Sequence, residues 1–528
     1  MEESNSQSTS YSVRIPKMEK NIIIVAKGGG ITFVGKIFLS IARLATAVLL
    51  ARLLGAKQYG MYTLAISIVT IVASISVFGL DSALIRYIAI LNSRQDRSGV
   101  WGALQVGIGT AVLFSVLSGV ALYGLSFILA DQVFHEPGLA PLFQLASVFV
   151  PLLTLSDVLS GAVRGFKRMD FAMIAQFVAQ PVVRLILIVI FALVGLNASL
   201  AVASYGLADL SASILLIYFI NKVFPLKRPQ DAPRRDVKEI LTFSVPVWLS
   251  ELMSKFQNNI QTLVLGTANA ITGVGVFSVA NQLTMVTGQF SSSINVSAKP
   301  VVAELHHQGD IKQLEHIYQS TTKWSLMVQL PVFLTLVLFP AEILSIFGQS
   351  FAAGAPALVI LALADLINVG TGMGGIIIDM TGHTKLKLAN SIIRLIIYIG
   401  LSFYLIPSWG LIGAAVVALA GEGVVNLLRF FEVYILLRIL PYNQSFIKPL
   451  VASALSLICV LVLGIWIPPQ TSVIYTMINI GVLFLVYIVA TLLLGLSDEE
   501  RAMLAILSRR TRLLVSKGQA IIARAFSS

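Results

Sequence analysis

The sequence contains a series of apolar segments, each long enough to cross a lipid bilayer as a helix. A membrane-spanning helix needs about 20 predominantly apolar residues. Runs of this kind, separated by charged residues, glycines and prolines, occur fourteen times, at 28–54, 58–84, 100–130, 139–163, 169–196, 199–221, 239–266, 272–298, 322–347, 355–381, 386–407, 410–431, 446–467 and 472–496. Backbone polar groups inside a bilayer must be satisfied within the spanning structure, which such runs achieve as helices. The sequence therefore predicts an all-α integral membrane protein with about fourteen transmembrane helices.

The composition agrees with a membrane protein and excludes several kinds of site. Of the 528 residues, 57% are hydrophobic and 12% are charged, and the mean hydropathy is +0.88. A soluble domain carries about one-quarter charged residues. The single cysteine, Cys459, excludes an intrachain disulfide and a cysteine metal cluster, and no His-x-x-x-His pair is present. We therefore expect no metal site, no catalytic residues and, in the absence of a Walker motif, no nucleotide hydrolysis.

The basic residues predict which side of the membrane each loop faces. Cytoplasmic loops carry an excess of lysine and arginine. With the N-terminus inside and the span boundaries allowed to shift by a few residues, thirty of the 37 basic residues fall in cytoplasmic segments, and Arg52 and Lys57 fall in an outside loop. This distribution predicts a multi-pass protein with both termini in the cytoplasm. The location expected for it is the cell inner (plasma) membrane. The distribution also accounts for the net charge of +12 without a nucleic-acid partner.

Two segments of the chain repeat each other at an offset of 215 residues. LLGAKQYGMYTLA (53–65) matches VLGTANAITGVGVFSVA (264–280), and Gly60 corresponds to Gly275. The repeat predicts two six-helix lobes that enter the membrane in the same direction. The expected organisation is a cytoplasmic N-terminal segment (1–27), a first lobe (28–224), a cytoplasmic linker (225–238), a second lobe (239–440), two further helices (441–496) and a basic amphipathic cytoplasmic tail (497–528).

The first of these segments also carries a family resemblance. ARLLGAKQYGMYTLAISIVTIVASISVFGLDSALIRYIA (51–89), the matching 264–280 motif and the turns RGFKR and TGHTKLK resemble Wzx-type flippases of the multidrug/oligosaccharidyl-lipid/polysaccharide exporter superfamily. The resemblance covers about residues 28–440. It implies two lobes around a central cavity and a cargo of polyprenyl-diphosphate-linked oligosaccharide, moved from the inner to the outer leaflet for surface polysaccharide biosynthesis. The implied partners are this lipid-linked oligosaccharide, membrane lipids and other polysaccharide-assembly proteins.

Charged residues lie inside the predicted spans. A lysine, arginine or aspartate at a helix centre costs about 2.5–3.5 kcal/mol on insertion scales, so such groups face one another or a wet cavity. The basic members are Lys36, Arg43, Arg184, Lys255 and Arg394, and the acidic members are Asp157, Asp209, Glu251, Asp365, Asp379 and Glu422. These residues are expected to mark the interior of the transporter.

The basic members are candidates for binding an anionic cargo. Lys36, Ser40 and Arg43 recur at i, i+4 and i+7, along one stripe of a helix. A lipid diphosphate needs fixed cations once water is removed, and arginine grips phosphate with two donors. In the alternative interpretation, Lys36 extends to the headgroups and Arg43 pairs structurally with Asp157 or Asp209. The further cavity candidates are Arg184, Lys255 and Arg394.

The acidic members of the second lobe are candidates for energy coupling. Intramembrane carboxylates often belong to ion or proton pathways. We expect a coupling proton or sodium ion to bind at one or more of Glu251, Asp365 and Glu422. No other cofactor is expected. Glu251 and Lys255 are four residues apart on a predicted helix, so a simple mutual ion pair is the alternative for both.

Three other functions remain open at this stage. A multidrug or cation extruder of the same superfamily would need an acidic cavity without a basic stripe. A membrane enzyme of glycan assembly would need a sizeable outside loop, but the predicted outside loops, such as IPSWG and IPPQT, are short. A non-transporting component of a glycan-assembly complex is compatible with the sequence.

Overall fold

The protein is helical throughout the described part of the chain. The computed structural model describes residues 17–225, 237–268, 270–466 and 473–495, with side chains described from Ser40 onward except those of Ile465, Trp466 and Val473, and no strand occurs in these ranges. The predicted tail (497–528) and most of the predicted linker (225–238) lie outside the described residues.

The helices account for the predicted membrane spans. Ten helical segments in the described ranges are long and apolar enough to cross a membrane. Two of them, Ser40–Ser93 and Thr384–Leu437, are each 54 residues long and hold two expected spans. In these segments the chain turns at Gly55 (φ 70°) and at Gly410 (φ 52°, ψ −124°), conformations that favour glycine. With α8 (Val237–Thr267) and the shorter apolar helix α9 (Ile271–Thr287) supplying the other spans, the predicted all-α transmembrane fold is confirmed.

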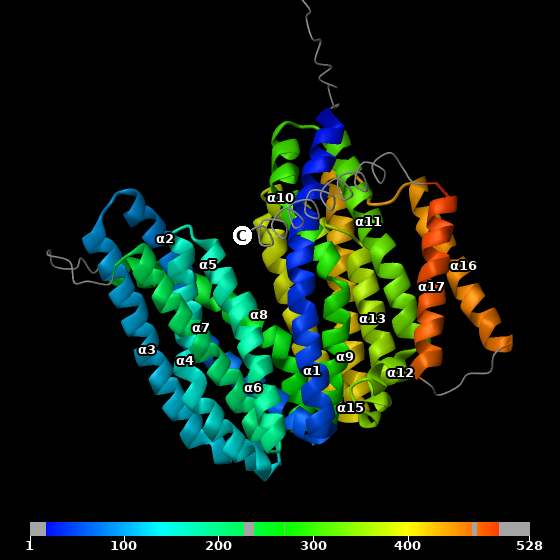
Figure 1. Ribbon diagram of the computed structural model, residues 1–528. Helices are drawn as coiled ribbons and strands as arrows, with labels where there is room; N and C mark the ends of the chain where they lie inside the picture. Colours follow the sequence, from blue (N-terminus) through cyan, green and yellow to red (C-terminus); the bar gives the residue numbers. More distant parts are fainter. Residues whose placement is uncertain (1–16, 226–236, 269, 467–472, 496–528) are drawn as a thin grey trace, which may run out of the picture.

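The chain forms two bundles that stand side by side (Figure 1). The helices before the predicted linker are α1 (Lys17–Val77), α2 (Leu80–Ser93), α3 (Arg97–Ile128), α4 (Ala140–Gly165), α5 (Met169–Met173), α6 (Gln180–Val194) and α7 (Ala198–Val223). Those after it are α8 (Val237–Thr267), α9 (Ile271–Thr287), α10 (Gln289–His307), α11 (Ile311–Leu338), α12 (Pro340–Ser345), α13 (Ala355–Gly370), α14 (Gly374–Met380) and α15 (Thr384–Leu437). The first part of α1 stands beside α9 and α10 of this second set (Figure 1). Two further helices, α16 (Ile447–Trp466) and α17 (Val473–Leu493), pack against each other and against α11.

One hydrophobic core joins the two bundles at one end of the molecule. This core contains Leu54 and Phe134 from the first bundle together with Ile271, Phe351 and Ile406 from the second. These residues lie near short turns between helices, so we call this end the joined end.

At the opposite end the bundles have separate cores. Phe166 and Phe219 belong to a core of the first bundle, whereas Ile294 and Tyr318 belong to a core of the second. We call this the linker end, because α7 ends and α8 begins there. Because the bundles share a core at the joined end and have separate cores at the linker end, the main contact between them lies at the joined end.

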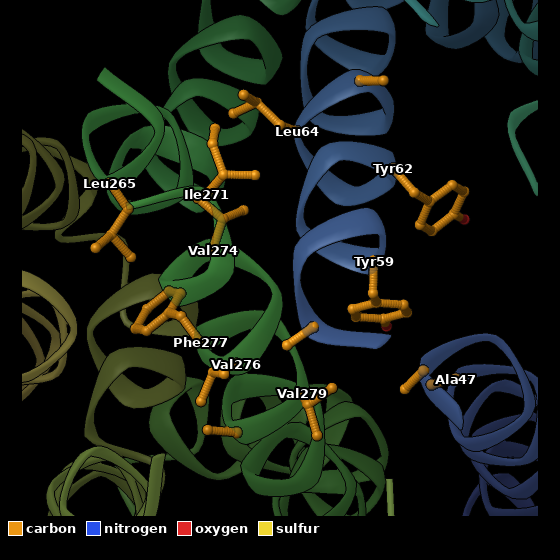
Figure 2. Close-up of a cluster of buried hydrophobic side chains, with 14 of the residues drawn as sticks. Ala47, Tyr59, Tyr62, Leu64, Leu265, Ile271, Val274, Val276, Phe277 and Val279 are labelled. Atoms are coloured by element: carbon orange, nitrogen blue, oxygen red, sulfur yellow. The ribbon is translucent and has the colours of Figure 1, made fainter. Parts of the chain in front are cut away.

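The contact at the joined end depends on the two glycines that the repeat relates. A Cβ on Gly60 would lie 2.0 Å from the carbonyl oxygen of Ile271, and a Cβ on Gly275 would lie 2.4 Å from that of Ala56. Ala56 and Ile271 are themselves 215 residues apart, so the contact is reciprocal. Figure 2 shows Leu64 of α1 beside Ile271, with Tyr59 and Tyr62 projecting from the other side of α1. Only glycine permits this approach of α1 to α9.

Helix α8 is attached to both bundles. Near its beginning, the Ser244 carbonyl oxygen lies 2.5 Å from where a Cβ on Gly79 would be, and the Trp248 ring packs against that of Phe78 with centroids 4.9 Å apart and planes tilted by 36°. Near its end, the Gln261 side chain donates a hydrogen bond of 3.0 Å to the Ala414 carbonyl in α15. The helix therefore crosses from one bundle to the other.

Among the predicted spans that are interrupted, two are broken where another helix approaches. The span expected at 58–84 is interrupted at Phe78 and Gly79, which have φ of 51° and 67°. The span expected at 355–381 is interrupted at Thr371–Met373, where Gly372 (φ 71°) leaves room for Thr322 of α11. Tertiary contacts, which hydropathy does not report, set both breaks.

We predict that Gly60→Val opens the joined end. Overpacking a tight contact costs about 1–3 kcal/mol, which changes a two-state ratio by about five- to 150-fold. In a Cys459→Ala background, a cysteine introduced at Ser67 should then react faster with a membrane-impermeant thiol reagent added from the joined end. Gly124→Val, at an α3 position with no atom within 4 Å of its Cβ, is the control. Equal reactivity of the two variants would contradict the role of this contact.

Candidate functional site

A cavity of about 650 Å³ lies between the two bundles. Most of its wall comes from the first bundle, and α8 and α9 supply the remainder. The lining residues that carry charge or hydrogen-bonding groups are Arg43, Thr46, Tyr59, Tyr62, Thr63, Ser67, Thr70, Ser74, Asp157, Gln176, Gln180, Arg184, Tyr205, Asp209, Lys255, Asn259, Ser278 and Gln282. Three of the six sequence-predicted cargo residues, Arg43, Arg184 and Lys255, are thus brought together on one cavity.

Arg43 is the least constrained of the three cations. Its side chain is exposed to the cavity and makes no ion pair with any described residue. Its backbone carbonyl accepts a hydrogen bond of 3.2 Å from Gln282 of α9, which ties this part of α1 to the second bundle. The alternative in which Arg43 pairs with Asp157 or Asp209 is not the arrangement observed.

Arg184 is held in place by aromatic residues. Its Nη2 donates to the Tyr62 hydroxyl, and its guanidinium lies 4.9 Å from the centre of the Tyr205 ring. Its Nε is buried and has no hydrogen-bond partner. The arginine is therefore fixed by the cavity wall but retains an unused donor.

Two carboxylates share the cavity with these cations. Asp157 of α4 lies within electrostatic reach of Lys255, and Asp209 of α7 lies within reach of Arg184. Gln180 lies beside the Asp209 carboxylate, whose Oδ2 is buried without a hydrogen-bond partner. With all five groups ionised, the cavity carries one net positive charge.

A stripe of hydroxyl groups on α1 completes the wall of the cavity. Its four residues were not among the predicted site residues. Thr63, Ser67, Thr70 and Ser74 lie at i, i+4, i+7 and i+11 and all line the cavity. Thr63, Thr70 and Ser74 donate their hydroxyl protons to backbone carbonyls within α1. Their oxygens remain able to accept hydrogen bonds from a ligand. The helical spacing of these four residues was the signal available in the sequence.

The other residues of the predicted basic stripe have different positions. Ser40 is buried in α1 and is not among the residues that line the cavity. Lys36 belongs to α1, but its side chain lies outside the described residues. The stripe therefore contributes Arg43 to the cavity.

Glu251 and Lys255 do not form the ion pair considered from their spacing. Glu251 accepts a hydrogen bond of 3.2 Å from Ser82 of α2, whereas Lys255 lines the cavity. Among the described residues no ion pair joins the two. Contact between α2 and α8 draws Glu251 toward the first bundle, which is why the local expectation is wrong.

Arg394 and Glu422 lie in the second bundle and pair with each other. Arg394 Nη1 is 3.0 Å from Glu422 Oε1, and each side chain is 24% exposed. Tyr398 also donates to Glu422, at 3.3 Å. Neither charged residue lines the central cavity.

Asp365 of α13 has a different environment from the other two coupling candidates. It accepts hydrogen bonds from Thr287 and, at 2.8 Å, from Gln329. No cation pairs with Asp365 among the described residues. The described ranges also contain no group of three or more potential metal ligands. Neutral donors alone hold this carboxylate.

Comparison with known proteins identifies the family. The model of the polysaccharide biosynthesis protein family matches residues 25–306, more than half of the chain. This chain belongs to that family. The MatE model also matches, over residues 246–404. The predicted resemblance to the oligosaccharide branch of the exporter superfamily is thereby confirmed.

Individual relatives of the chain are distant but match most of its length. Stage V sporulation protein B of Bacillus subtilis is 22% identical, over 78% of this chain and 83% of the relative. A putative O-antigen transporter of Shigella flexneri is 21% identical, over 70% of this chain and 87% of the relative. The solved structure of lipid II flippase MurJ in an inward closed conformation superposes with a TM-score of 0.70 at 14% identity, covering 87% of this chain and 98% of that structure. The last comparison establishes a shared fold.

We predict that Arg394 and Glu422 stabilise the second bundle as a pair. Arg394→Met should lower the free energy of unfolding by about 1–3 kcal/mol, less than for a fully buried pair, because it leaves Glu422 without its cation. The double variant R394M/E422Q should recover most of this loss. Thermal unfolding in detergent measures both effects, and strictly additive single-variant effects would contradict the pairing.

Proposed function

We propose that this protein is a flippase that moves a polyprenyl-diphosphate-linked oligosaccharide from the inner to the outer membrane leaflet by alternating access. The observation that carries the proposal is the cavity between the bundles, in which Arg43 and Arg184 present guanidinium groups that no carboxylate pairs directly. The family of the chain and the names of its relatives, an O-antigen transporter and a lipid II flippase, support this cargo class.

The cavity has suitable groups for both parts of such a cargo. A diphosphate that leaves water must exchange its hydration for fixed donors, and guanidinium groups bind phosphate oxygens in pairs. Arg43, Arg184 and Lys255 supply that charge. The hydroxyl stripe of α1 and the rings of Tyr59 and Tyr205 face the same space and suit a sugar, which has both hydroxyl groups and apolar faces.

The arrangement of the bundles supports alternating access. The shared core and the Gly60–Gly275 contact close the joined end, while the bundles have separate cores at the linker end. Release at the opposite leaflet requires the joined end to separate and the linker end to close. We assign the linker end to the cytoplasm of the cell that carries the protein in its inner (plasma) membrane, with both termini on that side, because the excess of basic residues lies there.

Transport of this kind needs no covalent step and is proposed to need no cofactor beyond a coupling ion. We assign the coupling proton or sodium ion to Asp365, because neutral donors hold it while Glu422 is paired with Arg394 and Glu251 with Ser82. Partners other than the lipid-linked cargo and the membrane are proposed to be proteins of polysaccharide assembly.

A second candidate function, extrusion of cationic compounds, is favoured by one observation. Asp157 and Asp209 line the same cavity, and the MatE model matches residues 246–404. An extruder would bind its cation at these carboxylates and would not need Arg43. The effect of removing the arginines therefore separates the two functions.

We predict that Arg43→Gln combined with Arg184→Gln lowers the rate of flipping by about tenfold or more, because two charge-assisted contacts to the diphosphate are lost. The measurement is the appearance of lipid-linked oligosaccharide at the far leaflet of proteoliposomes, detected with an impermeant glycosidase. Arg94→Gln, an exposed arginine in the α2–α3 turn, is the matched control. Unchanged flipping in the double variant would overturn the proposed function.

We predict that Asp365→Asn removes the response of flipping to an imposed ion gradient. The amide cannot carry the charge that exchanges with the ion, although it keeps the size of the side chain. Rates in proteoliposomes with a proton or sodium gradient test this, with Glu342→Gln, an exposed carboxylate in α12, as the control. Indifference of the unsubstituted protein to both gradients would remove the coupling proposal.

A further inference from the structure

A second cavity, of about 340 Å³, lies inside the second bundle near the linker end. It is lined by α10, the α13–α14 break, α14 and both halves of α15, and it is open on one side. It shares no lining residue with the central cavity. Its polar lining consists of Asn295, Lys299, Asn368, Asp379, Lys387, Asn390, Ser391, Arg394, Asn426 and Arg429.

The charges that line this second cavity are mostly positive. Lys387 Nζ is 2.8 Å from Asp379 Oδ1, and Arg394 pairs with Glu422 behind the wall. Lys299 and Arg429 have no ion pair among the described residues. Two cations therefore remain without a carboxylate in direct contact.

The remaining carboxylate nearby does not remove this imbalance. Glu432 accepts a hydrogen bond of 2.7 Å from Asn390, and both Glu422 and Glu432 act on Arg429 only at longer range. Arg394 is close enough to Arg429 for the two guanidinium groups to repel each other. A site that holds two arginines together is stabilised when an anion enters it.

The two arginines retain donors and space for such an anion. Arg394 Nε is buried without a hydrogen-bond partner. Arg429 Nη1 donates to Asn426 Oδ1 at 3.3 Å, a long contact that leaves its other donors free. The Arg429 Cζ lies 3.4 Å from where a Cβ on Gly375 would be, so the glycine gives the guanidinium room against α14.

We propose that this second cavity is a binding site for a phosphate group, carried either by the headgroup of an anionic lipid or by a soluble phosphate compound. Arg429 and Arg394 provide paired N–H donors, Lys299 provides an exposed charge, and the amides of Asn295 and Asn368 provide neutral donors. The site goes beyond the proposed transport function, because its occupancy is measured by binding alone and uses none of the central-cavity residues.

The test is calorimetric titration of the full chain with pyrophosphate in nanodiscs of neutral phosphatidylcholine. The variant K299Q/R429Q should weaken one class of binding site by about tenfold or more. The variant R43Q/R184Q should keep that same class, because its residues lie in the other cavity. Binding to K299Q/R429Q that equals binding to the unsubstituted protein, or complete loss of binding in R43Q/R184Q, would overturn the proposal. Arg94→Gln is the surface control.

A second measurement distinguishes the two sources of the phosphate group. Nanodiscs that contain phosphatidic acid are used, and native mass spectrometry counts the anionic lipids that each variant retains. Retention of one fewer lipid by K299Q/R429Q assigns the site to a headgroup, whereas weakened pyrophosphate binding alone assigns it to a soluble phosphate. A variant that differs from the unsubstituted protein in neither measurement refutes the site.

If Arg429→Gln prevents folding, the single variant Lys299→Gln still tests the site. Lys299 is exposed, so Lys299→Gln leaves the packing intact. It should weaken pyrophosphate binding by about two- to fivefold, and more strongly at low than at high ionic strength. No change at either ionic strength would count against the proposal.

Discussion

The close approach of α1 and α9 determines at which end the space between the two bundles is closed. Two glycines at equivalent positions of the repeat let each backbone meet the carbonyl oxygen of the other helix, and a continuous apolar core surrounds that contact. Because packed interiors do not deform continuously, a tight contact at one end leaves the bundles free to diverge at the other. The position of the central cavity, the side from which it is reached and the surfaces that must part during transport all follow from this joint.

The sequence predicted the architecture well because membrane insertion imposes strong and local rules. Apolar length identified the spans, and the 215-residue offset paired Gly60 with Gly275 before their contact was known. The break at Gly79 was not predicted, since it depends on Ser244 of a helix distant in sequence, and the form of the break at Gly372 depends in the same way on Thr322. Hydropathy describes one segment at a time and contains no information about such approaches.

The site was predicted in outline, from the cost of burying charge. That reasoning required a polar interior for Arg43, Arg184 and Lys255, and all three line one cavity. It did not separate Arg394, whose partner Glu422 lies 28 residues along the same folded-back helix. The hydroxyl stripe of α1 was not predicted, because serine and threonine barely change the hydropathy of a span. These residues nevertheless determine which ligands the cavity can bind.

Helix α8 has a mechanical consequence for the motion of the bundles. It is anchored to α2 around Ser244 and Trp248 and to α15 at Gln261, and Pro246, beside the first anchor, removes one of its backbone hydrogen bonds. Any rotation of one bundle relative to the other must therefore bend or twist this one helix. The curvature of α8 should therefore change with the angle between the two bundles, and elastic strain in this one helix opposes their rotation.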